Sequence, residues 1–212
     1  VLDSVENFEI EIEMNNEKMV RILESTGDEV DIVKVITQRL KKVIKFVLSG
    51  IQETNYPVSY DEQDAMLQNY MKILWGEDYK PGSRVYPKNF VGPSQYTLQM
   101  QNVVPVSDDV DLPNIRKKYT VTEKADGDRK LMMIDSTGKV YFINTNMNVQ
   151  FTGTKTAKEA LFNTIIDGEH ILHDKSGKFI NLYAAFDVYY INKRDVRALG
   201  FVPSEKDDVQ TN

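Results

Sequence analysis

The second half of the chain is built from short alternating runs of apolar and polar residues, a pattern that suits a sheet buried on one face. Two such runs, residues 131–134 and 139–143, flank the turn sequence Asp135-Ser136-Thr137-Gly138 and predict a β-hairpin. Other runs predict strands near residues 165–166, 169–172 and 182–190, a turn at Ser176-Gly177 and a short helix over residues 156–162. The chain beyond residue 118 is therefore expected to be β-rich.

A lysine stands at the start of this half, in the sequence Tyr119-Thr120-Val121-Thr122-Glu123-Lys124-Ala125-Asp126-Gly127-Asp128-Arg129-Lys130. The Tyr, Thr and Val residues predict a strand over residues 119–124, and Asp126-Gly127 predicts a turn. A nucleophilic lysine must lose its proton, although its ordinary pKa is about 10.4. Arg129 would lower that pKa through its charge, and Gly127 would let a phosphate approach the backbone. The simpler interpretation is a solvated turn with a surface Lys-Asp pair.

The N-terminal residues 5–14 alternate between apolar side chains and glutamates, which predicts a half-buried strand. Alternate residues of a strand lie roughly 6.6 Å apart on one face. Glu9, Glu11 and Glu13 would then form a row that a divalent metal ion could bridge. An edge strand kept soluble by its acids explains the same pattern without a metal.

Two helices are predicted between this strand and the β-rich half. The first covers about residues 28–49, and its basic residues Arg39, Lys41, Lys42 and Lys45 are expected to form a solvated face. The second begins at the capping-box sequence Ser59-x-x-Glu62 and ends at Gly76, with Leu67, Tyr70, Met71 and Leu74 buried. Residues 80–113 are expected to be irregular apart from one strand near residues 96–100, and residues 204–212 to be disordered.

Composition limits the possible partners. The formal net charge of −6 argues against general nucleic-acid binding, so an RNA or phosphate site must be a local basic patch. The candidates for that patch are Arg116, Lys117, Lys118, Lys124, Arg129 and Lys130. The absence of cysteine excludes disulfides and thiolate metal sites. With no leader and no apolar run of membrane-spanning length, neither secretion nor a membrane partner is expected, and the start at Val1 suggests a partial segment.

Four stretches in this order and spacing resemble the covalent nucleotidyltransferases, and among them the mRNA capping guanylyltransferases of large nucleocytoplasmic DNA viruses. The segment Phe90-Val91-Gly92-Pro93-Ser94-Gln95-Tyr96-Thr97-Leu98 is similar to the one that precedes the active-site lysine in that family. Lys124-x-Asp126-Gly127-x-Arg129 resembles its nucleophile motif. Residues 141–153 resemble its third motif, and Asp167-Gly168-Glu169 followed by Phe186-Asp187 resembles the next.

The resemblance implies an α+β fold: a mostly antiparallel, ATP-grasp or ligase-like nucleotidyltransferase half-domain over residues 81–212, a helical connector over residues 26–80, and a terminal strand of a triphosphate-tunnel domain within residues 1–25. It implies that Lys124 attacks GTP and carries GMP to a diphosphate-ended RNA, with Mg²⁺ or Mn²⁺ as cofactor. Nucleotide contacts are implied for Glu123, Asp126, Gly127, Arg129, Glu169 and Phe186. Arg129 would contact ribose or phosphate, Glu169 ribose or metal, and Phe186 would stack on guanine.

The same resemblance implies wider expectations for the parent protein. They are RNA 5′-triphosphatase activity with Glu9, Glu11 and Glu13 as metal ligands, further domains such as a methyltransferase, and a location in the host cytoplasm or the virion. The chain also departs from the family pattern, because Asn144-Thr145 stands where an Asp-Arg pair is usual. The later motifs, a second strand with paired lysines and a small β-barrel domain, would lie beyond Asn212.

Two other functions are consistent with the residues. An ATP-dependent polynucleotide ligase uses the same lysine chemistry with adenine, although Gly92 to Leu98 and Asp167-Gly168-Glu169 favour capping. In a non-catalytic segment, the two helices would instead dock neighbouring domains. A metal site at His170 and His173 is not expected, because residues three apart on a strand face opposite sides.

Overall fold

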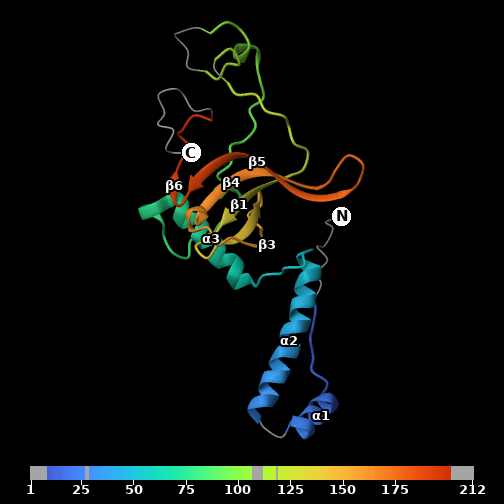
Figure 1. The fold of residues 1–212 in the computed structure, drawn as a ribbon. Helices are drawn as coiled ribbons and strands as arrows, with labels where there is room; N and C mark the ends of the chain where they lie inside the picture. The colour runs from blue at the N-terminus through green and yellow to red at the C-terminus, as the bar shows by residue number, and fades with distance from the viewer. Residues whose placement is uncertain (1–8, 27–28, 107–111, 118, 202–212) are drawn as a thin grey trace, which may run out of the picture. The chain divides into compact units, whose positions relative to one another are not determined.

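The computed structural model describes residues 9–26, 29–106, 112–117 and 119–201 (Figure 1). The chain divides into two compact units, residues 1–53 and residues 54–212, which are described separately below. No helix in the described ranges is both long enough and apolar enough to cross a membrane.

The first unit is a pair of helices, α1 (Asn16–Thr26) and α2 (Glu29–Ile51). The predicted helix over residues 28–49 is confirmed as α2, whereas α1 was not predicted. α1 begins after Asn15, whose side chain accepts a hydrogen bond from the backbone N–H of Lys18. Side chains of residues 12–22 and of α2, including Met19, Ile36 and Leu40, line a groove of about 290 Å³.

The strand predicted over residues 5–14 is wrong for its described part. Residues 9–15 have no regular structure, residues 1–8 lie outside the described residues, and Ile10 and Ile12 are exposed. A strand needs a neighbour to satisfy its backbone groups, and the described part of the first unit offers only helices. Within the described residues, no group of three or more acidic, histidine or cysteine side chains is placed to hold a metal ion. Metal binding by Glu9, Glu11 and Glu13 stays a prediction.

The described part of the second unit contains a six-stranded sheet in the order β3-β2-β1-β4-β5-β6, with every neighbouring pair antiparallel (Figure 1). The strands are β1 (Asp128–Ile134), β2 (Lys139–Asn144), β3 (Val149–Lys155), β4 (Thr164–His173), β5 (Phe179–Ile191) and β6 (Arg194–Asp195). Helix and antiparallel sheet are combined, as the predicted α+β class requires. The hairpin of residues 131–143 and the turn at Ser176-Gly177 are confirmed.

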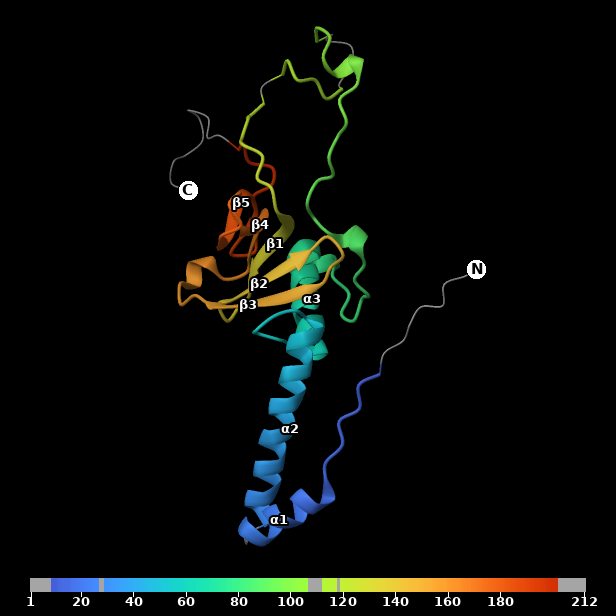
Figure 2. The same cartoon turned by 90° about the vertical axis from the view of Figure 1, so that its right-hand side faces the viewer.

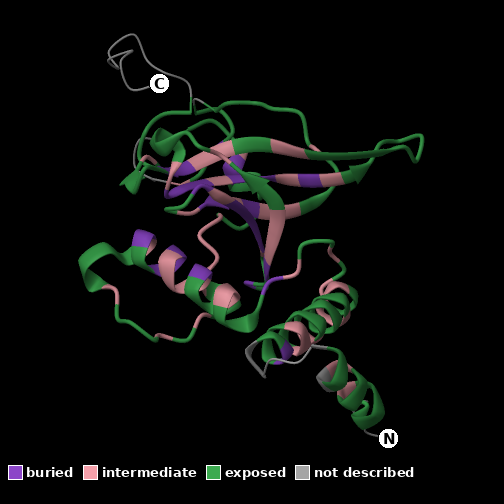
Figure 3. Cartoon of the chain, turned by 60° about the horizontal axis from the view of Figure 1, so that its bottom comes forward, coloured by how far each residue is buried: buried purple, intermediate pink, exposed green. Residues whose placement is uncertain are grey.

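Helix α3 (Tyr60–Trp75) supplies the helical side of the core. Its predicted ends are confirmed, since the Ser59 side chain accepts from the backbone N–H of Glu62 and Gly76 ends the helix. Of the predicted capping box only this Ser59 contact is formed, because the Glu62 carboxylate binds the sheet instead. One stripe of α3 is buried together with residues of the sheet, as the purple segments of both show (Figure 3). The buried residues are Val58, Met66, Tyr70, Met71, Ile73, Leu131, Met133, Tyr141, Ile143, Met147, Val149, Ile165, Tyr189 and Tyr190. α3 is thus a core element of this unit.

The carboxylate of Glu62 contacts the sheet. It accepts hydrogen bonds from Lys139 Nζ and Tyr141 Oη, each at 2.7 Å. Burial alone would raise the pKa of Glu62, but the hydrogen bonds from Lys139 and Tyr141 and the charge of Lys139 outweigh it. The pKa of Glu62 therefore lies below its ordinary value of 4.5. This contact joins the first turn of α3 to β2.

Glu62→Gln is expected to lower the free energy of unfolding by about 0.5–1 kcal/mol at pH 7, because the pair is partly exposed. A carboxylate whose pKa is lowered in the folded state stabilises the protein above its unfolded pKa and loses that contribution as pH falls through the folded value. The difference between wild type and variant should therefore shrink below pH 4.5 in urea unfolding. Glu77→Gln, at an exposed position, is the matched control and should show no such change; a constant difference across pH would contradict the prediction.

Two predicted strands are absent. Residues 93–99 are irregular and lead into a 3-10 helix at Met100–Asn102, and residues 119–126 are irregular up to the start of β1. Pro93 still contacts β1 through Arg129, and the described part of the chain that follows it, in green to yellow, extends away from the sheet (Figure 2). The predicted helix over residues 156–162 is a 3-10 turn at Glu159–Leu161. Residues 204–212, predicted to be disordered, lie outside the described residues.

Candidate functional site

The register of the central strands decides which motif residues share a face. Arg129 of β1 lies opposite Glu169 of β4, and Leu131 lies opposite Asp167. Because side chains alternate along a strand, these residues share the face that is buried with α3. In β5, Asp187 lies opposite Asp167 and Ala185 opposite Gly168, so Phe186 between them is an extra, bulged residue. A bulge redirects a side chain, as is common beside functional sites.

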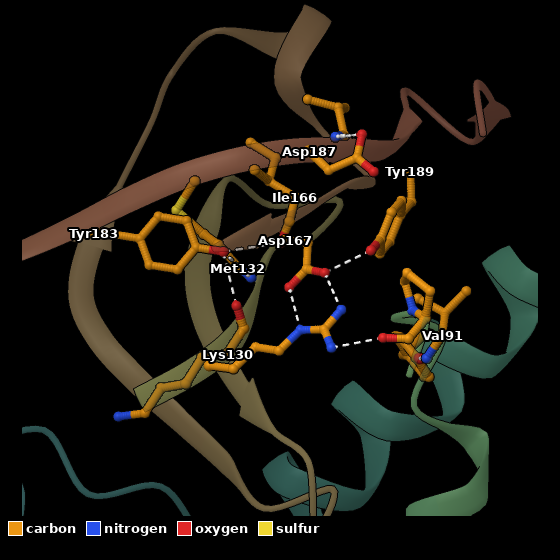
Figure 4. A network of polar contacts seen from close by, with 12 residues as sticks. Val91, Lys130, Met132, Ile166, Asp167, Tyr183, Asp187 and Tyr189 are labelled. Carbon is orange, nitrogen blue, oxygen red and sulfur yellow. Dashed lines mark hydrogen bonds and ion pairs between the residues drawn. The ribbon is translucent and has the colours of Figure 1, made fainter. Parts of the chain in front are cut away.

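A buried carboxylate organises this end of the face. The Asp167 side chain is fully buried, and both of its oxygens are hydrogen bonded. Arg129 Nε donates to Oδ1 at 3.2 Å and Nη2 to Oδ2 at 2.5 Å, while Tyr189 Oη donates to Oδ2 at 2.5 Å. Figure 4 shows Asp167 between Tyr189 and the guanidinium. The two-pronged contact fixes the plane of the guanidinium group.

The electrostatics of this network favour the charged pair. The hydrogen bonds to Asp167 raise the pKa of Arg129 despite partial burial. Burial raises the pKa of Tyr189, and donation to the Asp167 carboxylate raises it further. Tyr189 is therefore a neutral donor and Arg129 a permanent cation at physiological pH.

Arg129 also contacts residues 90–93, which precede the irregular residues 94–99. Its Nη1 donates to the carbonyl oxygen of Pro93 at 2.8 Å, and the guanidinium carbon lies 5.4 Å from the centre of the Phe90 ring. A Cβ atom at Gly92 would stand 2.5 Å from Arg129 Nη2 and from Phe90 Cε1, so a larger residue there would have to displace the guanidinium group or the Phe90 ring. On its other side the guanidinium lies 6.0 Å from the Phe186 ring centre.

Tyr70 of α3 anchors the same segment from the core. Its hydroxyl donates to the carbonyl oxygen of Asn89 at 2.7 Å and accepts from the backbone N–H of Val91 at 2.9 Å. Tyr70 is fully buried, and burial raises its pKa. Residues 89–93 are thus held by α3 at one end and by β1 at the other.

The predicted nucleophile lies on the irregular segment that enters β1. Glu123, Lys124 and Asp126 are exposed. Gly127 passes so close to β4 that a Cβ atom there would stand 2.7 Å from the carbonyl oxygen of His170. Because Gly127 has no side chain, the segment that carries Lys124 can lie directly against β4.

Glu169 links that segment to the network. Burial raises the pKa of its carboxyl, while the positive charges of Lys124 and Arg129 act in the opposite direction. Among the described residues, no hydrogen-bond donor reaches Glu169 Oε2, although this oxygen is buried. A buried oxygen without a protein donor requires a water, an ion or a ligand as its partner. The structure therefore brings together Arg129, Glu169 and Phe186, and Lys124 lies on the segment that leads into Arg129.

Comparison with known proteins identifies the family to which the chain belongs. The family model described as mRNA capping enzyme, catalytic domain, matches residues 60–203. The chain belongs to the mRNA capping enzyme family. The resemblance deduced from the motifs is confirmed at this level.

Two relatives are also described as capping enzymes. A probable mRNA-capping enzyme of Acanthamoeba polyphaga mimivirus is 27% identical over 194 residues, which cover 90% of this chain and 13% of the relative. An mRNA-capping enzyme of Danio rerio is 33% identical over 107 residues, which cover 46% of this chain and 18% of the relative. The chain therefore spans less than a fifth of the length of either capping enzyme.

The match to the capping family starts at the first residue of α3 and includes every candidate from Glu123 to Phe186, whereas Glu9, Glu11 and Glu13 lie outside it. Sequence reasoning missed Asp167 and Tyr189 as site residues, and it missed Tyr70 and Phe90 as supports. Asp167 stood inside a quoted motif, but its two partners lie 38 and 22 residues away in sequence. His170 is buried and its ring nitrogens contact Lys130 Nζ and Asn181 Oδ1.

Proposed function

We propose that this chain is part of an mRNA guanylyltransferase in which Lys124 takes GMP from GTP and passes it to a diphosphate-ended RNA. In the first step the neutral Nζ of Lys124 attacks the α-phosphorus of GTP. A P–N bond forms, the bond to the β-phosphate oxygen breaks, pyrophosphate leaves and Nζ releases a proton. In the second step a terminal phosphate oxygen of a diphosphate-ended RNA attacks that phosphorus, the P–N bond breaks and Nζ takes up a proton.

The observation that carries this proposal is that an exposed lysine lies on the segment leading into β1, whose Arg129 is fixed by Asp167 and lies opposite Glu169. Arg129 and Glu169 are paired across β1 and β4, and burial raises the pKa of Glu169 while the positive charges of Lys124 and Arg129 both act to lower it. An exposed lysine can also meet a nucleotide without displacing core residues.

Arg129 serves two roles in this proposal. Its guanidinium has five N–H donors, and the bonds to Asp167 and Pro93 use three of them. The remaining two donors are available for a ribose or phosphate oxygen. Arg129 is therefore oriented by the protein before the nucleotide arrives, which reduces the cost of ordering it on binding.

The base and the metal have candidate partners. Phe186, about one third exposed at its bulge and facing Arg129, offers a ring for stacking on guanine. Mg²⁺ in nucleotide sites is bound through one or two carboxylates and the substrate phosphates, and the donor-free oxygen of Glu169 fits that role. When bound, Mg²⁺ or Mn²⁺ would neutralise charge on the triphosphate. Glu123 and Asp126 flank Lys124 and are proposed to order its segment on the nucleotide.

Intact mass spectrometry after incubation with GTP or ATP, in the presence of Mg²⁺ or Mn²⁺, tests the proposal. A GMP adduct formed in preference to an AMP adduct is expected. An AMP adduct would support the alternative, an ATP-dependent polynucleotide ligase. If neither this chain nor the longest natural polypeptide that contains it forms an adduct with either nucleotide, the enzyme proposal fails and a non-catalytic structural role is the remaining interpretation. RNA triphosphatase activity and a methyltransferase domain in the parent protein remain predictions.

Gly127→Ala is expected to slow formation of the GMP adduct by at least about tenfold. The new methyl group would meet the His170 carbonyl oxygen at 2.7 Å and Ile171 Cγ1 at 3.0 Å, so the segment that carries Lys124 must move; displacing a reacting group by about 1 Å can cost about a hundredfold in rate. Single-turnover labelling measures the effect. Ala125→Gly, which adds no atom to the same segment, is the control, and equal rates for Gly127→Ala and wild type would refute the role of this contact.

A further inference from the structure

The hairpin of β4 and β5 extends beyond the rest of the sheet. β1 pairs with β4 only as far as the Asp128 and His170 pair, whereas β4 and β5 stay paired to His173 and Phe179 (Figure 1). Residues 171–182, named here the outer hairpin, are therefore a two-stranded ribbon. Such a ribbon has little hydrophobic burial of its own.

The outer hairpin exposes apolar side chains. Phe179 is 63% exposed and Leu182 is 50% exposed. His173 and Phe179 are paired across the strands, with ring centres 5.6 Å apart in an edge-to-face arrangement. An exposed aromatic ring next to a second ring on a projecting ribbon is a surface on which a flat group can stack.

This surface continues the face of the candidate site. Glu169 and Ile171 are alternate residues of β4 and point to the same side of the ribbon, with Leu182 paired opposite Ile171. The register against β5 shifts between Ile171 and the pair of His173 and Phe179 further out. At about 3.3 Å per residue, His173 lies roughly 13 Å along the strand from Glu169. A flexible chain bound at Lys124 can reach the outer hairpin from the same side of the sheet.

The tip of the outer hairpin is ordered and carries basic residues. Asp174 Oδ1 accepts hydrogen bonds from the Ser176 hydroxyl at 2.6 Å and from the backbone N–H groups of Ser176 and Lys178 at 2.8 and 3.0 Å. These hydrogen bonds hold the Asp174 carboxylate within the turn and lower its pKa. Lys175 within that turn and Lys178 directly after it are both exposed. With the Asp174 carboxylate included, the two lysines leave the tip with a small positive charge, in contrast to the net charge of −6 for the chain.

We propose that the outer hairpin binds the single-stranded RNA that follows the 5′ end of the acceptor, an inference that rests on the proposed guanylyltransferase function. Phe179 stacks on a base, and Lys175 and Lys178 pair with backbone phosphates. An aromatic ring combined with basic side chains is the usual design of surfaces that hold single strands without reading their sequence. A protein partner would use the apolar residues but gain nothing from both lysines unless it were acidic.

RNA binding is measured by fluorescence anisotropy with a short 3′-labelled single-stranded RNA that carries a 5′ diphosphate. Phe179→Ala is expected to weaken binding by about fivefold or more. Lys175→Glu combined with Lys178→Glu is expected to weaken it and to make it less dependent on salt, because fewer counterions are released. The matched control, Lys155→Glu combined with Lys158→Glu near β3 on the opposite edge of the sheet, should bind like wild type.

Formation of the GMP adduct requires no RNA, so it separates this inference from the proposed function. The outer-hairpin variants should form the adduct at the wild-type rate and transfer GMP to RNA more slowly. If they bind RNA as wild type does, the inference is wrong and the hairpin is a surface for another protein. If wild type forms no adduct, the proposed function fails, whatever the anisotropy shows.

Discussion

Replacing Lys124 by arginine is expected to abolish the covalent GMP adduct. Arginine keeps the positive charge, but its guanidinium stays protonated in proteins and cannot act as an amine nucleophile. Any loss of labelling then reports the lost amine and not a lost charge. Intact mass spectrometry after incubation with GTP and Mg²⁺ gives the readout, and the expected signal of the variant is zero.

Lys130→Arg is the matched control, because it makes the same chemical change six residues further along. Lys130 lies on the other face of β1, where its Nζ contacts His170 Nδ1 at 2.9 Å and the Phe142 ring. The expected result is an adduct like that of wild type. The control is demanding, because burial lowers the pKa of Lys130 although the charge of Asp128 opposes this. An adduct that persists in Lys124→Arg and disappears in Lys130→Arg would move the nucleophile to Lys130.

Local signals in the sequence were sufficient to predict the hairpin of β1 and β2 and the helix α3. In the hairpin, Asp135 Oδ1 accepts from the backbone N–H groups of Thr137 and Lys139, so the turn is stabilised within five residues. In α3, Ser59 and Gly76 cap the helix that they flank. Such contacts are encoded by neighbouring residues and can be predicted without knowledge of the rest of the fold.

Strand prediction failed where pairing depends on distant segments. Residues 119–124 have high β-propensity, yet Val121 is 92% exposed and pairing of β1 begins only at Asp128. The alternating residues 9–14 likewise have no partner strand in the described part of their unit. Propensity measures how well a residue fits a pleated surface, and it does not supply the neighbouring strand.

The candidate site was only partly predictable for the same reason. The motif pattern named Lys124, Arg129, Glu169 and Phe186, and the register of β1, β4 and β5 explains why the last three lie near one another. No local pattern predicted that Arg129 would bind Asp167 and the Pro93 carbonyl, because those contacts span 38 and 36 residues. The bulge that presents Phe186 is likewise a property of the paired strands.

Asp167→Ala is expected to lower the free energy of unfolding of the second unit by about 3 kcal/mol. Removing one partner of a buried ion pair costs about 3–5 kcal/mol, and the Arg129 side chain, 26% exposed, can recover part of that by hydration. The Tyr189 hydroxyl would lose its acceptor as well, since it donates to the same carboxylate. Urea unfolding followed by circular dichroism measures the change.

Tyr189→Phe separates stability from positioning in the same network. It removes one donor and is expected to cost about 1 kcal/mol, which leaves a folded protein and an intact Arg129 and Asp167 pair. If Tyr189 acts only on stability, the folded variant labels with GTP at the wild-type rate. If it orients Asp167 and through it Arg129, labelling slows at saturating GTP while the fold is retained. An Asp167→Ala variant as stable as wild type would contradict the expected stabilisation by the network, and only the labelling rate would then test its role in positioning Arg129.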